Sequence, residues 1–346
     1  MVFSSFFAAF YNQIDGTSKA DHLVGTSDDD WIEGFAGNDL LFGRGGDDQL
    51  FGGDGYDKLF GEAGHDELFG GKGDDFLDGG LDNDWLEGGS GDDTLKGGKG
   101  HDDLFGDSGN DVLNGGAGLD YFDGGSGIDT VTFADESARV WVSLADGDAD
   151  VAEGREHLDD IENVIGSRFN DSIEGDRKNN SLKGGEGNDE IFGGSGNDTL
   201  EGGHGDDKLF GQHGDDTLIG GSGNDELEGG AGDDTLTGLL GDDILNGTDA
   251  HAAGKGERDF IQTGEGHDVV VLGDAHRAYY AAQGFDDFAG IADFNVKQDK
   301  LVLFGSADKY TVQENNGSSQ ILLDGDRIAI LTGVGHLNLK ASAHFV

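Results

Sequence analysis

Cysteine and proline are both absent from the 346 residues of this chain. Without cysteine there can be no disulfides and no thiolate metal sites, so oxygen atoms are the abundant ligands that remain. Without proline every residue keeps its backbone N–H, which suits a continuous ladder of short strands. No stretch approaches the roughly 20 apolar residues of a membrane span, so none is predicted.

Basic residues are scarce. The chain has 21 Lys and Arg against 72 Asp and Glu, a formal net charge of −51. This charge opposes any compact state unless cations are built into the fold. It also disfavours nucleic acid as a partner, because no basic patch exists to release counterions from phosphates. We therefore expect a polyvalent cation as the main partner.

What the chain does have is an aspartate every nine residues, in two arrays. Residues 88–96 read GGSGDDTLK, with glycines before the Asp and an apolar residue two positions after it. The first array has no gap and comprises Asp21, Asp30, Asp39, Asp48, Asp57, Asp66, Asp75, Asp84, Asp93, Asp102, Asp111, Asp120 and Asp129. The second comprises Asp171, Asp189, Asp198, Asp207, Asp216, Asp225, Asp234 and Asp243, with Asn180 in its one gap.

The residues around each Asp predict a turn followed by a short strand. Glycines allow positive φ and close approach of the backbone to a ligand, so the six residues that end in Asp form the turn. The next three form the strand, and its middle residue points into the core. In the first array that residue is never polar: Leu23, Ile32, Leu41, Leu50, Leu59, Leu68, Leu77, Leu86, Leu95, Leu104, Leu113, Phe122 and Val131.

Two nonapeptides must form one coil, because a single short strand can close a core only against a second strand. Residues 18 apart then stack at about 4.8 Å, so Asp48 and Asp66 lie on the same edge. Carboxylates this close repel each other unless they share a cation, and oxygen ligands in flexible geometry favour Ca²⁺ over Mg²⁺. This pairing allows at most eleven shared sites in the first array and seven in the second, about 18 ions in all.

Glycine carbonyls freed by the turns are the expected second type of ligand. The predicted calcium ligands are the aspartates of both arrays from Asp30 onward. The predicted glycine ligands are Gly53, Gly55, Gly71, Gly73, Gly89, Gly91, Gly98, Gly100, Gly116, Gly118, Gly194, Gly196, Gly203, Gly205, Gly221, Gly223, Gly230 and Gly232. We expect weaker binding at the ends, where the loops before Asp21 and Asp30 have few glycines, and at the neutral Asn180.

At these residues the chain resembles the RTX (repeats-in-toxin) family, whose nonapeptide is Gly-Gly-x-Gly-x-Asp-x-apolar-x. The resemblance covers residues 21–131 and 166–247, with a further pair of repeats ending at Asp259 and Asp268. It implies an all-β fold, a right-handed parallel β-roll with calcium in the turns. It also implies secretion of the unfolded chain by a type I system that reads an uncleaved C-terminal signal, and folding on external calcium.

The two arrays are out of phase, so the chain must leave the roll between them. Val140, Val142 and Leu144 alternate with other residues and are followed by a turn, which predicts an inserted hairpin. After the second array glycine becomes rarer and apolar strands lengthen, which predicts a β cap that carries the export signal. The expected parts are an N-terminal capping or docking segment (1–20), the first array (21–132), hairpin and lead-in (133–165), the second array (166–247) and the cap (248–346).

Aromatic residues follow the core position at 18-residue spacing. Alternation points these rings outward in ladders that either stabilise the sheets or mediate association. The pairs are Phe42 with Phe60, Phe51 with Phe69, and Phe192 with Phe210. In the N-terminal segment, Phe3, Phe6, Phe7, Phe10 and Tyr11 have spacings that predict a helix over the first coil or a docking element for another subunit.

No catalytic motif accompanies the repeats, so we expect no enzyme. Five of the histidines, His65, His101, His204, His213 and His267, occupy variable turn positions. The hypothesis is a secreted, extracellular or cell-surface structural protein, homo-oligomeric or polymeric, that folds on calcium. Alternatives are an adhesin or carbohydrate-binding protein that uses the Phe ladders or Trp31, Trp85 and Trp141, and an accessory portion of a secreted enzyme. The start of the array at residue 21, after Met1, argues against the accessory portion.

Overall fold

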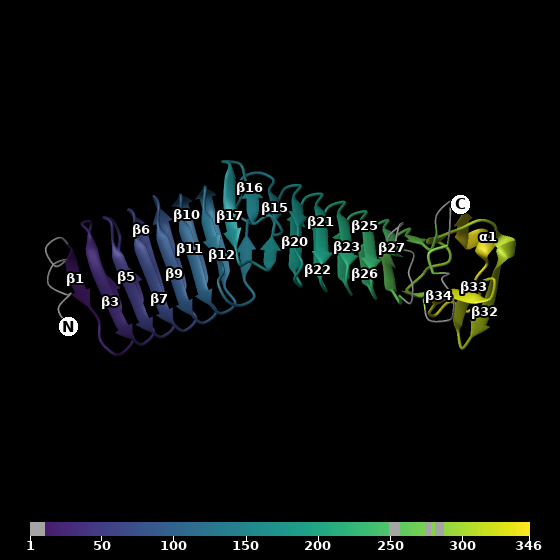
Figure 1. Ribbon diagram of the computed structural model, residues 1–346, viewed down its shortest axis with the longest axis horizontal. Coiled ribbons are helices and arrows are strands. Elements are labelled where there is room, and N and C mark those ends of the chain that lie inside the picture. The colour runs from purple at the N-terminus through teal and green to yellow at the C-terminus, as the bar shows by residue number, and fades with distance from the viewer. Residues whose placement is uncertain (1–10, 249–256, 274–277, 281–286) are drawn as a thin grey trace. The chain divides into compact units, whose positions relative to one another are not determined.

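Short strands alternating with glycine-rich turns account for nearly all of the regular structure (Figure 1). The chain divides into two units, residues 1–167 and 168–346. A computed structural model describes residues 11–248, 257–273, 278–280 and 287–346.

The first unit consists of strands that pair in parallel with the strand one coil away. In one sheet β5 pairs with β7, Leu50 opposite Leu68, and in the other β6 pairs with β8, Leu59 opposite Leu77. Successive strands therefore belong to opposite sheets, and one coil is 18 residues, as predicted. The strands are β1 (Asn12–Asp15), β2 (His22–Val24), β3 (Asp30–Ala36), β4 (Leu40–Phe42), β5 (Gln49–Asp54), β6 (Lys58–Ala63), β7 (Glu67–Lys72), β8 (Phe76–Leu81), β9 (Trp85–Ser90), β10 (Thr94–Gly100), β11 (Asp103–Ser108), β12 (Val112–Gly118), β13 (Tyr121–Asp123), β14 (Thr130–Thr132), β15 (Trp141–Ser143), β16 (Asp148–Asp150), β17 (Arg155–Asp159) and β18 (Asn163–Ile165).

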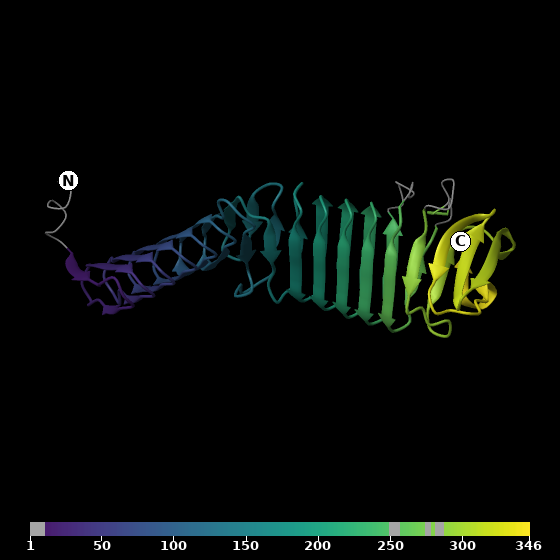
Figure 2. The same cartoon turned by 90° about the horizontal axis from the view of Figure 1, so that it is seen from below.

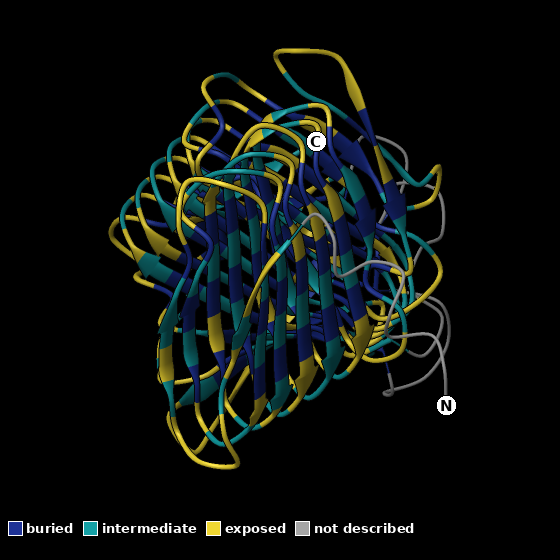
Figure 3. Cartoon of the chain, turned by 90° about the vertical axis from the view of Figure 1, so that its left-hand side faces the viewer, coloured by how far each residue is buried: buried dark blue, intermediate teal, exposed yellow. Residues whose placement is uncertain are grey.

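The core lies between the two sheets and is built from the middle residue of each strand. The predicted core residues from Ile32 to Val131 are at most 1% exposed, whereas Leu23 in β2 is half-buried. Burial of one such side chain contributes about 1.5–3 kcal/mol, so the repetition of the pattern supplies most of the apolar stabilisation. Figure 3 shows the resulting alternation of buried and more exposed bands along the strands.

The N-terminal segment begins the roll earlier than expected. Asn12–Asp15 form strand β1, which pairs with β3 so that Ile14 lies opposite Ile32. The helix predicted around Tyr11 therefore does not extend into residues 12–15, because this stretch is held in the sheet ladder. The rest of the prediction, on residues 1–10, lies outside the described residues.

Between the two arrays the chain leaves the roll and returns. Strands β15 and β16 form an antiparallel hairpin, and β17 runs antiparallel to β16. Strand β17 also pairs in parallel with β13, so that Tyr121 lies opposite His157. Strand β18 pairs with β14 in the same way, with Thr130 opposite Asn163. The hairpin is therefore an insertion after which both sheets of the first unit resume.

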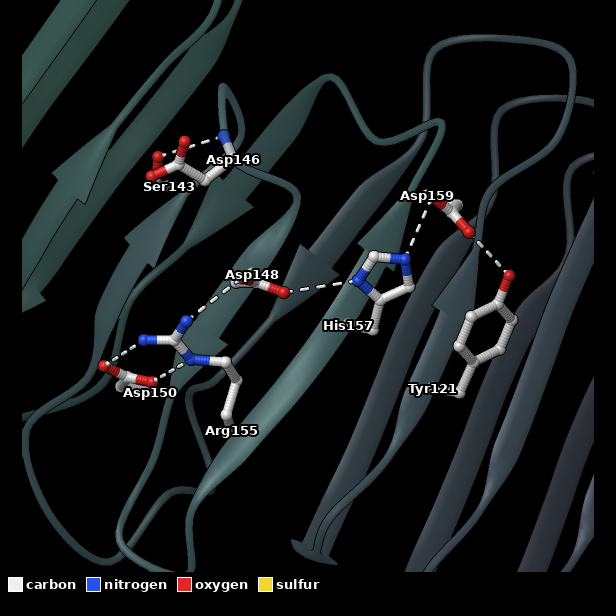
Figure 4. Close-up of polar contacts among 8 residues, drawn as sticks. All are labelled: Tyr121, Ser143, Asp146, Asp148, Asp150, Arg155, His157 and Asp159. Atoms are coloured by element: carbon white, nitrogen blue, oxygen red, sulfur yellow. Dashed lines mark hydrogen bonds and ion pairs between the residues drawn. The ribbon is translucent and has the colours of Figure 1, made fainter.

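Polar contacts join this hairpin to the roll (Figure 4). Asp148 lies 3.3 Å from Arg155 Nη1 and 3.2 Å from His157 Nδ1. Asp159 lies 3.3 Å from His157 Nε2 and accepts a 2.7 Å hydrogen bond from the Tyr121 hydroxyl. Most of these side chains are well exposed, so the contacts orient the hairpin more than they stabilise the fold.

The second unit repeats the same architecture and ends in a mixed β cap. Figure 2 shows its strands, in teal and green, side by side. The elements are β19 (Ser172–Glu174), β20 (Ser181–Glu186), β21 (Glu190–Ser195), β22 (Thr199–His204), β23 (Lys208–His213), β24 (Thr217–Ser222), β25 (Glu226–Ala231), β26 (Thr235–Leu240), β27 (Ile244–Thr248), β28 (Phe260–Glu265), β29 (Val269–Val271), β30 (Ala289–Ala292), β31 (Lys300–Leu303), η1 (Ala307–Lys309), β32 (Tyr310–Asn315), β33 (Ser318–Leu323), β34 (Asp326–Leu331), α1 (Leu339–Ser342) and β35 (Ala343–Phe345).

Parallel stacking in the second unit continues past residue 247. Strand β26 pairs with β28, Leu236 opposite Ile261, although the sequence between them is longer than in a regular coil. Strands β30 and β31 add a further coil. The antiparallel strands β32, β33 and β34 then join this coil through β30. Within the described ranges, no helix has the length and apolar character needed to cross a membrane.

Candidate metal centre

The aspartates of the repeat form a hydrogen-bonded ladder along each edge of the roll. The backbone N–H of Asp48 donates to Oδ1 of Asp66 at 2.8 Å, and the N–H of Asp66 donates to Asp84 at 2.9 Å. The other edge is equivalent, with the N–H of Asp39 donating to Asp57 at 2.7 Å. One carboxylate oxygen of each residue is thus used to hold consecutive coils in register.

The second oxygen, Oδ2, is buried and has no hydrogen-bond partner at most positions. In the first unit these positions are Asp39, Asp48, Asp57, Asp66, Asp75, Asp84, Asp93, Asp102, Asp111, Asp120 and Asp129. In the second unit they are Asp189, Asp198, Asp207, Asp216, Asp225, Asp234, Asp243 and Asp268. A buried polar atom without a partner is costly, and a charged one far more so. We call these nineteen the open positions.

Each open oxygen of the regular coils borders a space that the first glycine of its turn keeps free. A Cβ on Gly52 would lie 2.6 Å from Asp57 Oδ2 and 2.7 Å from the carbonyl oxygen of Gly70 in the next coil. At Gly70 the corresponding distances to Asp75 Oδ2 and the Gly88 carbonyl oxygen are both 2.6 Å. Oxygens from two consecutive coils therefore face the same small volume.

This donor set fits calcium. Hard carboxylate and carbonyl oxygens in an adaptable turn are the ligands that Ca²⁺ takes, six to eight at a time. Over the described ranges no three Asp, Glu or His side chains converge as a metal cluster, so backbone carbonyls must supply part of the set. A bound cation would supply the positive charge that the paired carboxylates lack.

Burial raises the pKa of the ladder carboxyls. It raises Asp57 to about 6, Asp93 to about 7 and Asp84 to about 8. The N–H hydrogen bond from the preceding coil acts in the opposite direction, and neighbouring carboxylates raise these pKa values further. The carboxyls with the highest pKa values, such as Asp84, therefore retain protons near neutral pH in the metal-free turns, and a bound cation would displace them.

The predicted glycine ligands lie in these turns, and the backbone there requires glycine. All of them except Gly55 have positive φ. A Cβ on Gly71 would lie within 3.2 Å of the backbone of Gly53 in the preceding coil. The carbonyl oxygens that border the same spaces as the open carboxylates belong to the first glycine of the motif, as at Gly70, a position outside the predicted set.

The terminal positions differ from the regular ones. Oδ2 of Asp30, a predicted ligand, accepts the backbone N–H of Thr26 at 2.5 Å. The side-chain oxygen of Asn180 accepts the N–H of Asp176 at 2.9 Å. In these turns a donor four residues earlier occupies the oxygen.

The ladder also extends through residues that were not chosen as ligands. The N–H groups of Asp234 and Asp243 donate to Oδ1 of Asp259 at 2.9 Å and of Asp268 at 3.0 Å. Asp268 in turn donates to Asp299 at 3.3 Å. The Gly-x-Gly-x-Asp sequence before Asp268 was a usable signal, whereas Asp299 stands outside the nine-residue spacing.

Glutamates replace aspartate where the first unit resumes after its hairpin. The N–H of Asp129 donates to Glu162 Oε2 at 3.0 Å. Glu156 precedes His157 as Asp120 precedes Tyr121, and it is 3% exposed. Nothing in the nonapeptide pattern identifies these two glutamates, because both stand outside the repeat.

Two histidines in the turns have a structural role. His65 Nδ1 accepts the backbone N–H of Asn83 at 3.1 Å, and His101 Nδ1 accepts that of Leu119 at 2.9 Å. In neighbouring coils the same place is taken by Asp or Asn, as where Asp47 accepts the N–H of His65 at 2.9 Å. These exposed side chains form a second ladder outside the carboxylates, consistent with their predicted turn positions.

Together, the parallel coils and their oxygen-lined turns define a calcium-binding β-roll. The RTX calcium-binding nonapeptide repeat family, described in units of four copies, matches about two thirds of the chain, and the chain belongs to this family. The matched residues are 15–50, 42–77, 78–113, 97–131, 165–200, 192–227, 219–251 and 246–276.

Among solved structures, the chain is similar to the extracellular lipase LipA from Serratia marcescens, with 17% identity and a TM-score of 0.19. The match covers 83% of this chain and 40% of the lipase chain, so this chain spans less than half the length of that protein. No curated protein matches the sequence.

The raised carboxyl pKa values predict how pH affects the metal-free protein. The folded pKa values of about 6 to 8 lie above the ordinary value of 3.8, so the folded state binds more protons than the unfolded state between about pH 4 and 8. In chelator, the free energy of unfolding should therefore fall as pH rises through this window. Circular dichroism of the protein in chelator at several pH values gives the folded fraction, which should decrease from pH 4 to 8. A folded fraction that stays the same throughout would contradict the prediction.

Substitution of the first glycine should damage one site by filling it. Gly70→Ala places a methyl group 2.6 Å from both Asp75 Oδ2 and the Gly88 carbonyl oxygen, so folding should require more calcium. Gly335→Ala is the control, because nothing lies within 4 Å of its Cβ position. Calcium titrations followed by circular dichroism give the two midpoints. Equal midpoints for both variants would show that the space beside Gly70 is not part of a calcium site.

Proposed function

We propose that this protein is a calcium-gated structural protein of the cell exterior, which folds when calcium fills its turns. The observation that carries the proposal is the set of nineteen buried carboxylate oxygens without a protein partner. With a net charge of −51, the metal-free roll gathers like charges along both edges. Cations that bind only the folded turns stabilise that state by mass action.

An extracellular location agrees with this chemistry. Calcium modules that work outside cells have dissociation constants of about 10⁻⁴ to 10⁻³ M. Cytosolic calcium sensors bind the ion more tightly. The C-terminus agrees with export before folding, because β35 pairs with β31 and places Phe345 opposite Leu303 in the folded chain. A type I secretion apparatus that reads this end would meet it while the chain is still unfolded.

A structural and self-assembling role is supported by the aromatic ladders. Phe42 and Phe60 stack with ring centroids 5.0 Å apart, and Phe51 and Phe69 stack at 4.9 Å. These rings are half-buried, so each ladder presents a short apolar strip to a neighbouring molecule, which ends at Asp78 or Glu87 in the next coil. We infer a polymer or homo-oligomer built through these strips, and no catalytic activity.

An adhesin that binds carbohydrate is the second candidate, and one observation bears on it. Trp85 is 39% exposed, and its ring centroid lies 4.4 Å from that of Phe105. Trp31 lies 4.6 Å from Phe51 in the same way. Sugars stack on open ring faces, whereas each of these tryptophan rings lies close to a phenylalanine ring, which takes up part of its surface. This arrangement favours the structural role.

Removal of calcium should unfold the repeats at neutral pH. In excess chelator the β signal in circular dichroism should be lost, and added calcium should restore it cooperatively. Magnesium is the control ion, because its stricter geometry fits these turns poorly. A spectrum that is the same in chelator and in calcium would contradict calcium-gated folding.

Assembly should depend on the aromatic strips. In millimolar calcium the purified protein should form ordered polymers visible by electron microscopy. A variant with Phe42, Phe51, Phe60 and Phe69 changed to Thr should fold normally but stay monodisperse. The pair Phe192→Thr and Phe210→Thr tests whether the second unit contributes. Monodisperse wild-type protein, or polymers of the fourfold variant, would argue against this assembly.

A further inference from the structure

At one ladder position in the second unit, a side chain donates a hydrogen bond to the Oδ2 atom that has no partner at the open positions. We call such a position closed. Asp259 stands at the equivalent place to the open positions, and its Oδ1 accepts the N–H of Asp234 at 2.9 Å. Its Oδ2, however, accepts a short hydrogen bond from the hydroxyl of Tyr280. Asp259 is therefore satisfied at both carboxylate oxygens, unlike Asp234 one coil earlier.

The hydroxyl of Tyr280 lies where the open positions have a backbone carbonyl oxygen beside the carboxylate. The atoms nearest to a Cβ on Gly247 are Asp259 Oδ2 and the Tyr280 hydroxyl oxygen. At Gly229 the atoms in the corresponding places are Asp234 Oδ2 and a backbone carbonyl oxygen, that of Gly247. The phenol thus stands where the next coil would otherwise offer a carbonyl ligand.

The hydrogen bond from Tyr280 to Asp259 is shielded from solvent. Tyr280 is 1% exposed and lies between β29 and β30 in the sequence, and β30 pairs with β28, the strand that follows Asp259. Burial and the Asp259 carboxylate raise the pKa of Tyr280 well above its ordinary value, so the phenol keeps the proton that it donates. A neutral donor can thus satisfy the carboxylate without any added charge.

We propose that Tyr280 is a built-in substitute for calcium at Asp259, so that this turn and the strand β28 that follows it form without the ion. The inference rests on the proposed function, because it separates a calcium-independent part of the second unit from calcium-gated repeats. Its basis is that the residues at Asp259 do not fit the cation that the open positions accept.

The other chain-end positions are closed by internal donors as well. Oδ2 of Asp299, the last member of its ladder, accepts the N–H of Asn295 at 2.6 Å. At the N-terminal end Asp21 accepts the N–H of Thr17 at 2.5 Å. Closed positions thus bound the open ones, and Tyr280 is the case where the donor comes from another coil.

Hydrogen exchange of the full-length wild-type protein in chelator tests the proposal. Amides of β28, which follows Asp259, should exchange at least about tenfold more slowly than those of β21 in the open repeats. Equally fast exchange in both strands would overturn the proposal while leaving calcium-gated folding intact. Slow exchange in both would instead contradict calcium-gated folding.

The variant Tyr280→Phe tests the role of the hydroxyl. It should lose the protection of β28 in chelator, regain it in calcium, and bind one more calcium ion per chain in equilibrium dialysis. Tyr310→Phe is the matched control, because that hydroxyl donates to the Phe304 carbonyl oxygen in the cap and touches no ladder carboxylate. Unchanged protection and calcium content in Tyr280→Phe would overturn the proposal, whatever the control shows.

Discussion

The structure depends on buried carboxylates that are only half satisfied by the protein. Each ladder aspartate uses one oxygen to accept an N–H from the preceding coil, as Asp66 does from Asp48 at 2.8 Å. At the open positions the other oxygen is buried and unpartnered. Each turn therefore holds a buried negative charge that lacks a positive partner. In acid a proton neutralises this charge, and at neutral pH calcium does so. Metal binding and coil stacking become one process, because the oxygens around each site come from two coils.

The rest of the architecture follows from keeping those oxygens in register. Glycine at the first turn position leaves the volume that Asp57 Oδ2 and the Gly70 carbonyl oxygen border. Insertions are tolerated where they leave the ladder intact: Asp234 bonds to Asp259, and Asp268 bonds to Asp299, across longer segments than a regular coil. The hairpin in the first unit follows the same rule, since Glu162 takes the ladder place after Asp129.

Much of the fold could be predicted from the sequence, because the aspartates and the apolar core residues repeat with the same nine-residue period. A nine-residue spacing of Asp and an apolar residue in phase with it predict the coil, the buried Leu68 and the edge position of Asp66, and the structure agrees on the fold and core. The carbonyl of Gly70 was missed because every glycine in the turn looks equivalent without coordinates. Asp299 and Glu156 escaped because their insertions break the spacing. Tyr280 could not be connected with Asp259 at all, since a contact between coils through an irregular segment leaves no periodic trace.

The most direct test of the account is to locate calcium in crystals of the loaded protein by its anomalous scattering. The account predicts peaks beside the open Oδ2 atoms, such as those of Asp57 and Asp207, coordinated by carbonyl oxygens of adjacent coils. It predicts no peak between Asp259 and Tyr280. Turns that hold water instead of calcium at the open carboxylates would contradict the central claim that these half-satisfied oxygens are the calcium sites.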